Sequence, residues 1–285
     1  MDETAIWSDM LSGTTVESIG RKDIPLKTTG HEKVRVSVCL SAKADGTRLK
    51  PFIVFGGAKR ECKVLNDEYK SKCVIASSSN AWMNEELTLE YIKTVIGKFS
   101  FQKRLLAWDS FECHMMQSIK QRLKSFNVDS VIVPGGCTPY IQAPDVSWNK
   151  PFKAHVTEAY DTWLSEGIHE YTKAGNMKPP PRRKVVDWIL EGWKKLPSEL
   201  IVKSFKTCGL SLPVDGSEDD KIHCFKKEGA CPDGASRLKD SLNILQEEES
   251  QINPFENITD SDVEDACEPF HLIDNDQESD EEIDV

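Results

Sequence analysis

The sequence predicts an α/β protein with a mixed β-sheet flanked by helices. Three observations lead to this fold class. Residues 31–39 alternate apolar and polar side chains with a period of two, which indicates a half-buried strand. From residue 84 the apolar spacing lengthens to that of a helix. Short apolar runs at 104–108 and 128–133 then alternate with helical segments, as in α/β proteins.

The elements follow in order along the chain. A strand at 31–39, a turn at 44–46 and a strand at 49–55 form a hairpin, and 73–76 is a short third strand. A helix from residue 84 precedes the strand 104–108, which ends at Asp109. A helix at 115–126 and a strand at 128–133 come next. After a Gly- and Pro-containing loop at 134–144, a long amphipathic helix is expected to reach about residue 168.

The ends of the chain differ from this pattern. Residues 1–7 look like the last part of a strand whose apolar body is missing, with Asp2 at its end. We therefore expect the chain to be a fragment, an alternative product or a gene model begun at an internal Met. Beyond a Pro-rich linker near 178–181, two short helices at 185–195 and 199–207 are expected to extend the domain. We expect one domain at 1–170, its helical extension at 171–226, and a disordered tail at 227–285.

Charge separates the tail from the rest of the chain. Residues 247–285 hold 16 of the 47 acidic residues and no Lys or Arg, so residues 1–246 carry 36 basic and 31 acidic residues. The mildly basic part suits a phosphate-binding surface. The acidic tail is expected to be disordered, and two further hypotheses are that it binds a basic nuclear partner or folds back over the basic domain.

Several classes of protein are excluded by composition. No apolar run reaches the roughly 18 residues of a membrane span, and no signal peptide is visible, which indicates an intracellular protein without a membrane partner. The nine cysteines include no CxxC pair, so neither a disulfide scaffold nor a zinc ribbon is indicated.

Three aspartates stand at the predicted element ends: Asp2, Asp109 and Asp145. Ligands of open α/β sheets lie beyond the carboxyl ends of strands, so these carboxylates are expected to converge there. Carboxylate oxygens suit Mg²⁺, with Mn²⁺ as an alternative, and such ions can drive in-line attack on a phosphodiester. The competing interpretation is that each aspartate caps a helix or forms a turn. Spacing alone does not decide between the two.

Four segments resemble the catalytic domain of pogo/Tigger-type transposases of the Tc1/mariner superfamily: MDETAIW (1–7), KTTGHEKVRVSV (27–38), LAWDSFECH (106–114) and VPGGCTPYIQAPDVSWNKPFK (133–153). DGSEDDKIHCF (215–225) is similar to the end of that domain, so the resemblance covers residues 1 to about 226. It implies an RNase H-like fold, a catalytic and metal-binding triad of Asp2, Asp109 and Asp145, and DNA as partner. Thirty-five residues separate Asp109 from Asp145, near the spacing of the family.

Further candidates surround the triad. Asn149 and Lys153 share a helix face with Asp145, where Asn149 is expected to orient Asp145 or touch DNA and Lys153 to meet a phosphate; a solvated helix edge is the alternative. Lys150 is a third candidate on this helix. Lys27 and His31 are weaker candidates for DNA backbone contacts, since a charged hairpin edge is the commoner explanation of such residues. His114 either faces the metal site or is simply exposed.

Two functions remain open at this point. The first is a transposase-derived nuclear protein that performs Mg²⁺-dependent cleavage and strand transfer of DNA, with a homodimer as the expected assembly. The second is a domesticated, catalytically inactive nuclear protein that binds DNA or chromatin. Relatives usually carry a helix-turn-helix region ahead of the catalytic domain, and none precedes Asp2 in this sequence.

Overall fold

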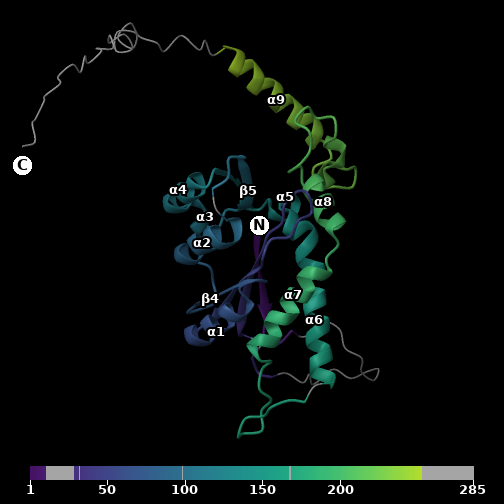
Figure 1. The fold of residues 1–285 in the computed structure, drawn as a ribbon. Helices are drawn as coiled ribbons and strands as arrows, with labels where there is room; N and C mark the ends of the chain where they lie inside the picture. The colour runs from purple at the N-terminus through teal and green to yellow at the C-terminus, as the bar shows by residue number, and fades with distance from the viewer. Residues whose placement is uncertain (11–28, 32, 98, 167, 252–285) are drawn as a thin grey trace, which may run out of the picture. The chain divides into compact units, whose positions relative to one another are not determined.

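The computed structural model describes residues 1–10, 29–31, 33–97, 99–166 and 168–251. Residues 1–235 form one compact unit, and residues from 236 onward belong to a second. The first unit is a mixed α/β structure (Figure 1). Its strands are β1 Asp2–Trp7, β2 Arg35–Leu40, β3 Phe52–Gly56, β4 Val74–Ser78, β5 Arg104–Asp109 and β6 Val128–Val133.

The helices of the first unit lie between and after these strands. They are α1 Lys59–Tyr69, α2 Glu85–Tyr91, α3 Glu112–Met115, α4 Gln117–Ser125, α5 Thr138–Ile141, α6 Asn149–Glu166, α7 Arg182–Lys195 and α8 Ser198–Thr207. The π-helical turn Ile92–Ile96 extends α2, and the π-helical turn Pro144–Trp148 leads into α6. Two 3₁₀ turns lie at Asp219–Lys221 and His223–Phe225. The helix α1 was not predicted from the sequence.

The described strands form two sheets rather than one. The first has the order β1-β2-β3-β4, with antiparallel pairing except between β3 and β4, and the second is the parallel pair β5-β6. The predicted hairpin and mixed sheet are thus present. The Met1 ammonium group donates a hydrogen bond to Ala107 O at 2.8 Å, which joins the start of β1 to β5.

Alternation along the central strands divides the core into two layers. Val38 and Leu40 of β2 face one layer with Ile53 of β3, whereas Cys39 and Phe52 face the other. The first layer is completed by side chains of α1, α6, α7 and α8, and the second by α2, α4 and β5. Period-two alternation in a doubly covered sheet produces this division directly.

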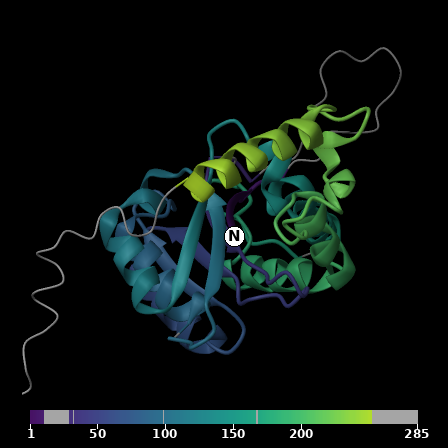
Figure 2. The same cartoon turned by 90° about the horizontal axis from the view of Figure 1, so that it is seen from above.

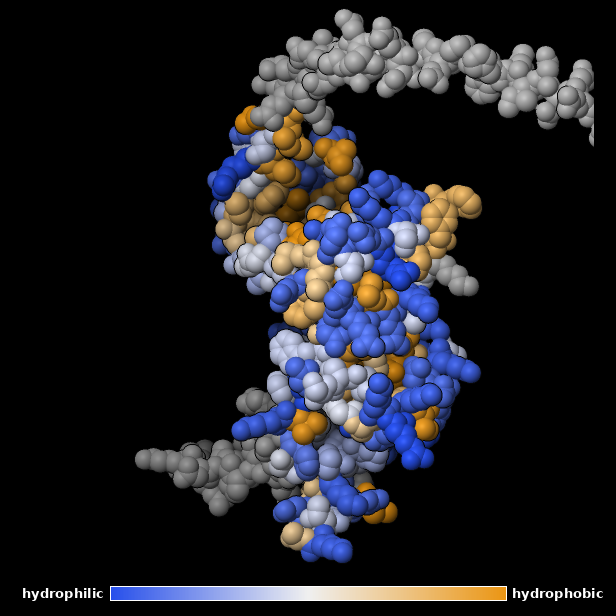
Figure 3. All heavy atoms as spheres, turned by 90° about the vertical axis from the view of Figure 1, so that its left-hand side faces the viewer, coloured by the Kyte–Doolittle hydropathy of each residue, from blue (hydrophilic) through white to orange (hydrophobic). Residues whose placement is uncertain are grey.

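Close packing joins the helices α6 and α7. A Cβ atom at Gly192 would come within 3.1 Å of Val156 and 3.4 Å of Phe152, so a residue without a side chain permits this approach. Viewed from above, the chain starts between the β5–β6 pair and the layer of α6, α7 and α8 (Figure 2). The face to which α1, α2 and α4 contribute is largely hydrophilic, with separate apolar spots (Figure 3).

The C-terminal segment differs in part from the sequence prediction. Residues 227–285 were expected to be disordered, but the structure contains the helix α9, Gly234–Gln251. Leu238, Leu242 and Leu245 recur at intervals of three or four residues, a helical spacing that the overall polarity of the segment obscured. The strongly acidic residues 252–285 lie outside the described residues.

Candidate metal centre

The three predicted aspartates come from three different elements. Asp109 is the last residue of β5, and Asp145 lies in the π-helical turn that leads into α6. Asp2 was predicted at the end of its strand, and this is wrong, because it is the first residue of β1 and pairs with Leu40. The residues that follow Asp2 form the strand, with Thr4 and Ile6 buried.

A single amide group connects Asp2 with Asp145. Asn149 Nδ2 donates to Asp2 Oδ2 at 2.6 Å and to Asp145 Oδ1 at 3.0 Å. The other oxygen of Asp2 accepts from Gln142 Nε2 at 2.9 Å. Asp2, Gln142 and Asn149 are all buried, whereas Asp145 lies at the surface. Asn149 is therefore not on a solvated helix edge, and it orients both carboxylates.

These two carboxyl groups carry unfavourable negative charge. Burial, followed by repulsion from Asp145, raises the pKa of Asp2 to about 7 against the stabilising hydrogen bond from Asn149. The pKa of Asp145 is also raised, first by desolvation of its carboxyl group and then by the charge of Asp109. Asp145 thus interacts electrostatically with both other aspartates.

Asp109 has a different set of partners. Its Oδ1 lies 2.8 Å from His114 Nδ1 and accepts from the Phe111 backbone N–H at 3.1 Å. Burial acts to raise the pKa of Asp109, but the hydrogen bonds from His114 and Phe111 outweigh it and lower the pKa. The bond to Phe111 confirms the turn-forming interpretation of Asp109, since one carboxylate oxygen closes the turn after β5.

His114 is held between two carboxylates. It is 1% exposed, so the expectation of an exposed histidine is wrong. Its ring stacks on Trp108 with centroids 4.0 Å apart, and Nε2 lies 3.3 Å from Glu3 Oε1. Burial lowers the pKa of His114, but the contacts with Asp109 and Glu3 raise it overall to about 9. A protonated imidazole offers no lone pair to a metal, so His114 acts here as a cationic partner of Asp109.

We refer to Asp2, Glu3, Asp109 and Asp145 as the acidic cluster. One ligand atom each from Glu3, Asp109 and His114 lie within 4.8 Å of one another, a grouping that could hold a metal ion if His114 were neutral. The other side of the cluster offers carboxylate oxygens from Asp2 and Asp145, the ligand type preferred by Mg²⁺.

The amides beside these carboxylates also fit a cation. Asn149 Oδ1 and Gln142 Oε1 are buried and accept no hydrogen bond from any part of the chain that the structure describes. Buried acceptors normally have a partner. Two unsatisfied oxygens beside two carboxyl groups of raised pKa therefore match the requirements of a hydrated divalent cation, which would supply positive charge and donor waters.

The predicted nucleic-acid contacts are divided between two places. Lys150 and Lys153 are exposed in the first turns of α6, and the charge of Lys153 acts to lower the pKa of Asp145. His31 lies elsewhere, because its backbone N–H donates to Asp9 Oδ2 at 2.8 Å. Asp9 follows the far end of β1, roughly 20 Å along the chain direction from Asp2. Lys27 lies outside the described residues.

Asp9 explains the motif around His31 in structural terms. This buried carboxylate accepts hydrogen bonds from Thr29 Oγ1 at 2.7 Å and Tyr160 Oη at 2.8 Å in addition to the bond from His31. These bonds lower its pKa although burial acts to raise it. The Thr29–His31 segment is thereby attached to β1 and α6.

Sequence reasoning missed Glu3 and Gln142 as members of the site. Glu3 follows Asp2 directly, and its carboxylate lies next to the His114 ring. Gln142, which donates to Asp2, lies in the connection between β6 and α6. Glu3 could have been noticed as a second acidic residue in the strand. Gln142 is an uncharged residue in a loop, and no pattern in the sequence distinguishes it.

Comparison with known proteins gives a consistent family. Residues 33–205 match the model of the DDE superfamily endonuclease family. The chain is similar to proteins named "Pogo transposable element with KRAB domain": 33% identity over 235 residues with the Mus musculus protein and 32% over 243 residues with the Homo sapiens protein. These alignments cover 81% and 84% of this chain but 38% and 39% of the relatives, so the chain spans about two fifths of their length.

A more distant relative is a Cochliobolus lunatus protein named "MFS-type transporter clz9", 25% identical over 157 residues, which are 54% of this chain and 17% of that protein. Among the described residues, no helix has the length and apolar character needed to span a membrane. No solved structure matches the chain.

The family model covers more than half of the chain, and it includes Asp109, Asp145 and Asn149. The matches to the pogo proteins extend over most of the chain. The chain therefore belongs to the DDE superfamily endonucleases and is a pogo-type, transposase-derived protein.

Proposed function

We propose that the acidic cluster is the centre of a divalent-cation-dependent nuclease that cleaves DNA phosphodiester bonds and transfers strands. Asp2, Asp109 and Asp145 are the proposed catalytic and metal-binding residues. The observation that carries the proposal is the Asn149 amide, which holds Asp2 and Asp145 together while Asp109 raises the pKa of Asp145. Three carboxyl groups from distant parts of the chain thus lie close enough for Asp145 to interact electrostatically with Asp2 and with Asp109.

The proposed cation is Mg²⁺, with Mn²⁺ as an alternative. A divalent ion bound there would activate a water or a 3′-hydroxyl of the DNA and would stabilise charge during in-line displacement at phosphorus. Asn149 and Gln142 hold Asp2 in place, and His114 fixes Asp109. Rigid support of this kind keeps carboxylates oriented before the cation arrives.

The substrate is proposed to be DNA in the nucleus, and the fold to be RNase H-like. Lys150 and Lys153 lie on the exposed start of α6, next to Asp145, where they would contact phosphates on either side of the cleaved bond. Contacts of this type give salt-sensitive binding with weak sequence preference. The names of the pogo relatives are consistent with an ancestral action on transposon DNA.

Nicking of supercoiled plasmid in Mg²⁺ tests the proposal. Wild-type protein should relax the plasmid, and Asp109→Asn and Asp145→Asn should each reduce the rate by about 100-fold or more, as expected when charge that stabilises a transition state is removed. Asp129→Asn is the matched control. Asp129 is an exposed residue of β6 that forms an ion pair with Lys103 and lies outside the acidic cluster.

The result also separates the two functions left open by the sequence. Equal nicking by wild type and Asp109→Asn would contradict the catalytic role. If the wild type binds DNA and Mg²⁺ but does not nick, the domesticated, inactive DNA- or chromatin-binding function replaces the nuclease.

A further inference from the structure

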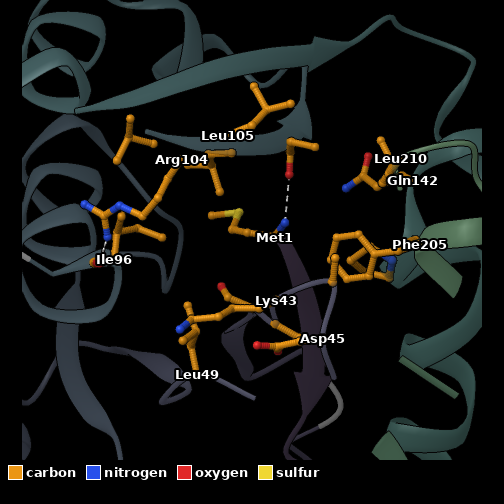
Figure 4. Close-up of a pocket in the computed structure, with 18 of the residues that line it drawn as sticks. Met1, Lys43, Asp45, Leu49, Ile96, Arg104, Leu105, Gln142, Phe205 and Leu210 are labelled. Carbon is orange, nitrogen blue, oxygen red and sulfur yellow. Dashed lines mark hydrogen bonds between the residues drawn. The ribbon is translucent and has the colours of Figure 1, made fainter. Parts of the chain in front are cut away.

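The two ends of β1 have different surroundings. At its start, the Met1 ammonium group donates a hydrogen bond to Ala107 O of β5 (Figure 4). At its end, a cavity of about 350 Å³ lies between β1 and α6, and we call it the β1–α6 cavity. Ala5, Trp7 and Asp9 line it on the strand side and Lys153 on the helix side. A volume of this size is in the range of small-molecule sites, and the lining specifies what kind of group fits.

The backbone of β1 contributes hydrogen-bonding groups on the edge that borders the cavity. Ser8 N–H donates to Val34 O, and in this register residues 2, 4 and 6 also direct their backbone groups toward β2. The N–H and C=O groups of Ala5 therefore point away from β2, on the edge where Ala5 lines the cavity. A polar ligand can bond to them without breaking a bond of the sheet.

Trp7 places an aromatic ring beside the cavity. This side chain is 44% exposed, and it stands opposite Arg35 of β2 at a pair without ladder hydrogen bonds, where side chains of neighbouring strands are closest. Arg35 is itself held in place, because its guanidinium group lies 3.7 Å from the centroid of the Trp82 ring and its Nε donates to Ser37 Oγ at 3.1 Å. Trp7 thus offers an exposed ring next to a fixed cation.

Charge is distributed unevenly around the cavity. Lys153 is exposed at its rim, whereas Asp9 is buried and accepts hydrogen bonds from Thr29 Oγ1 and Tyr160 Oη. A phosphate group would be attracted by Lys153 and repelled by Asp9, so it would stay at the rim. A neutral ring with polar edges fits the interior, where the buried Val156 adds apolar surface. An aromatic ring, backbone polar groups and a cation at the rim are the features with which proteins bind unpaired nucleotides.

We propose that the β1–α6 cavity takes up an unpaired nucleotide of the DNA substrate, with its base against Trp7 and its phosphate at Lys153. The inference rests on the proposed function, which makes DNA the ligand, and adds that the acidic cluster acts beside a nucleotide outside the duplex. Lys153 interacts electrostatically with Asp145, and Arg35 with Glu3, so both cations next to the cavity are near the cluster. Because an aromatic ring stacks on any base, the site selects an unpaired nucleotide rather than a sequence.

Two fluorescein-labelled DNA duplexes of the same sequence, one fully paired and one with a single bulged nucleotide, test the proposal. Fluorescence anisotropy with the full chain in EDTA gives both affinities without cleavage. The wild type should bind the bulged duplex about tenfold more tightly, the gain expected from stacking one base on an aromatic ring. In a third duplex the bulged nucleotide is 2-aminopurine, and its emission should fall on binding because stacking on Trp7 quenches it.

Variants of the ring identify the site. Trp7→Ala should lose both the preference for the bulged duplex and the fall in emission, whereas Trp7→Phe should retain a large part of both. Phe101→Ala, at a side chain that is 96% exposed, is the control and should behave as the wild type. Thermal melting checks that each variant is folded.

The outcomes distinguish this inference from the proposed function. Equal affinity of the wild type for the paired and the bulged duplex, or an unchanged preference in Trp7→Ala, would overturn the nucleotide site and leave DNA as the substrate. A wild type that binds neither duplex would contradict the proposed function and the nucleotide site together.

Discussion

Two aspartates on opposite sides of the acidic cluster, Asp2 and Asp109, have pKa values shifted in opposite directions. Asp2 is next to Asp145 and two neutral amides, and its pKa is raised to about 7. Asp109 is next to His114 and a backbone N–H, and its pKa is lowered. Both carboxyl groups are desolvated, so the difference comes from the charge of the partner. On the Asp109 side the buried His114 outweighs desolvation, whereas on the Asp2 side the charges of the Met1 ammonium group and Lys153 do not outweigh burial and carboxylate repulsion.

The largest expected effect is on the Asp109 side. His114→Ala should lower the free energy of unfolding by about 3 kcal/mol or more, because it leaves Glu3 and Asp109 without their buried cation and removes the ring stacked on Trp108. Urea unfolding at pH 7 measures this. His155→Ala is the control, since His155 lies 3.8 Å from Glu158 on the surface of α6. Similar losses in the two variants would show that His114 has no special electrostatic role.

A cation should act on the other side. At pH 8, Mg²⁺ at 100 times its dissociation constant should stabilise the folded protein by about 2.7 kcal/mol, since it binds only the assembled cluster. Asp145→Asn should remove this stabilisation, and Glu112→Gln, at an acidic residue of α3 outside the cluster, should keep it. Thermal melting with Mg²⁺ or EDTA gives the shift. An unchanged shift in Asp145→Asn would exclude Asp145 as a ligand.

Asn149 connects the two aspartates whose pKa is raised. Asn149→Ala should cost about 1–3 kcal/mol in the free energy of unfolding, because Asp2 loses a buried hydrogen bond of 2.6 Å. The loss is measured by urea unfolding, with exposed Asn176→Ala as the control. The cost should shrink at pH 5, where Asp2 is protonated in the folded protein. A cost independent of pH would indicate lost packing rather than lost charge orientation.

The pH dependence of stability should separate the two sides. The pKa of Asp2 is higher in the folded protein than its ordinary 3.8, so the folded state binds the extra proton and stability falls as the pH rises from about 4 to about 7. The pKa of His114 is raised to about 9, so its contribution is complete below 6.5 and is lost as the pH rises through 9. The contribution of Asp109 is lost only below its ordinary pKa.

Urea unfolding in EDTA should therefore show a slope of at most about 1.4 kcal/mol per pH unit from Asp2. Asp2→Asn should reduce the slope between pH 4 and 7, to which the raised pKa of Asp145 still contributes, and retain the one above 6.5. If Asp2→Asn leaves the lower slope unchanged, another group titrates there. Mg²⁺ should flatten the same region, since a bound cation favours ionised Asp2.

The smallest effect is expected at Lys153. Lys153→Gln should weaken DNA binding by about 0.5 kcal/mol and reduce the salt dependence by about one counterion, because an exposed phosphate contact contributes little by itself. Fluorescence anisotropy at several salt concentrations measures both. Lys173→Gln, an exposed lysine in the segment between α6 and α7, provides the control. Equal salt slopes in the two variants would remove Lys153 from the DNA surface.

The sequence by itself determined the α/β class and the positions of most elements. Apolar side chains recur with a period of two in β2 and with helical spacing in α2 and α7. These patterns reflect which side of each element is buried, so neighbouring residues suffice to predict the element. The motifs around Asp109 and Asp145 identified the family for the same reason, because each motif is a continuous stretch of sequence. Asp2 was predicted as a candidate site residue, but its position at the start of the strand was not predicted.

Only the tertiary structure decided which groups meet. Gln142 and Asn149 contact Asp2 across separations of 140 and 147 residues, and His114 of the helix α3 reaches Glu3 of β1. Such contacts depend on how β1, β5 and α6 pack, which no local spacing encodes. The opposite pKa shifts of Asp2 and Asp109 follow from those contacts, because a carboxyl group responds to the charge and hydrogen bonds within a few ångströms of it, whatever their distance along the chain.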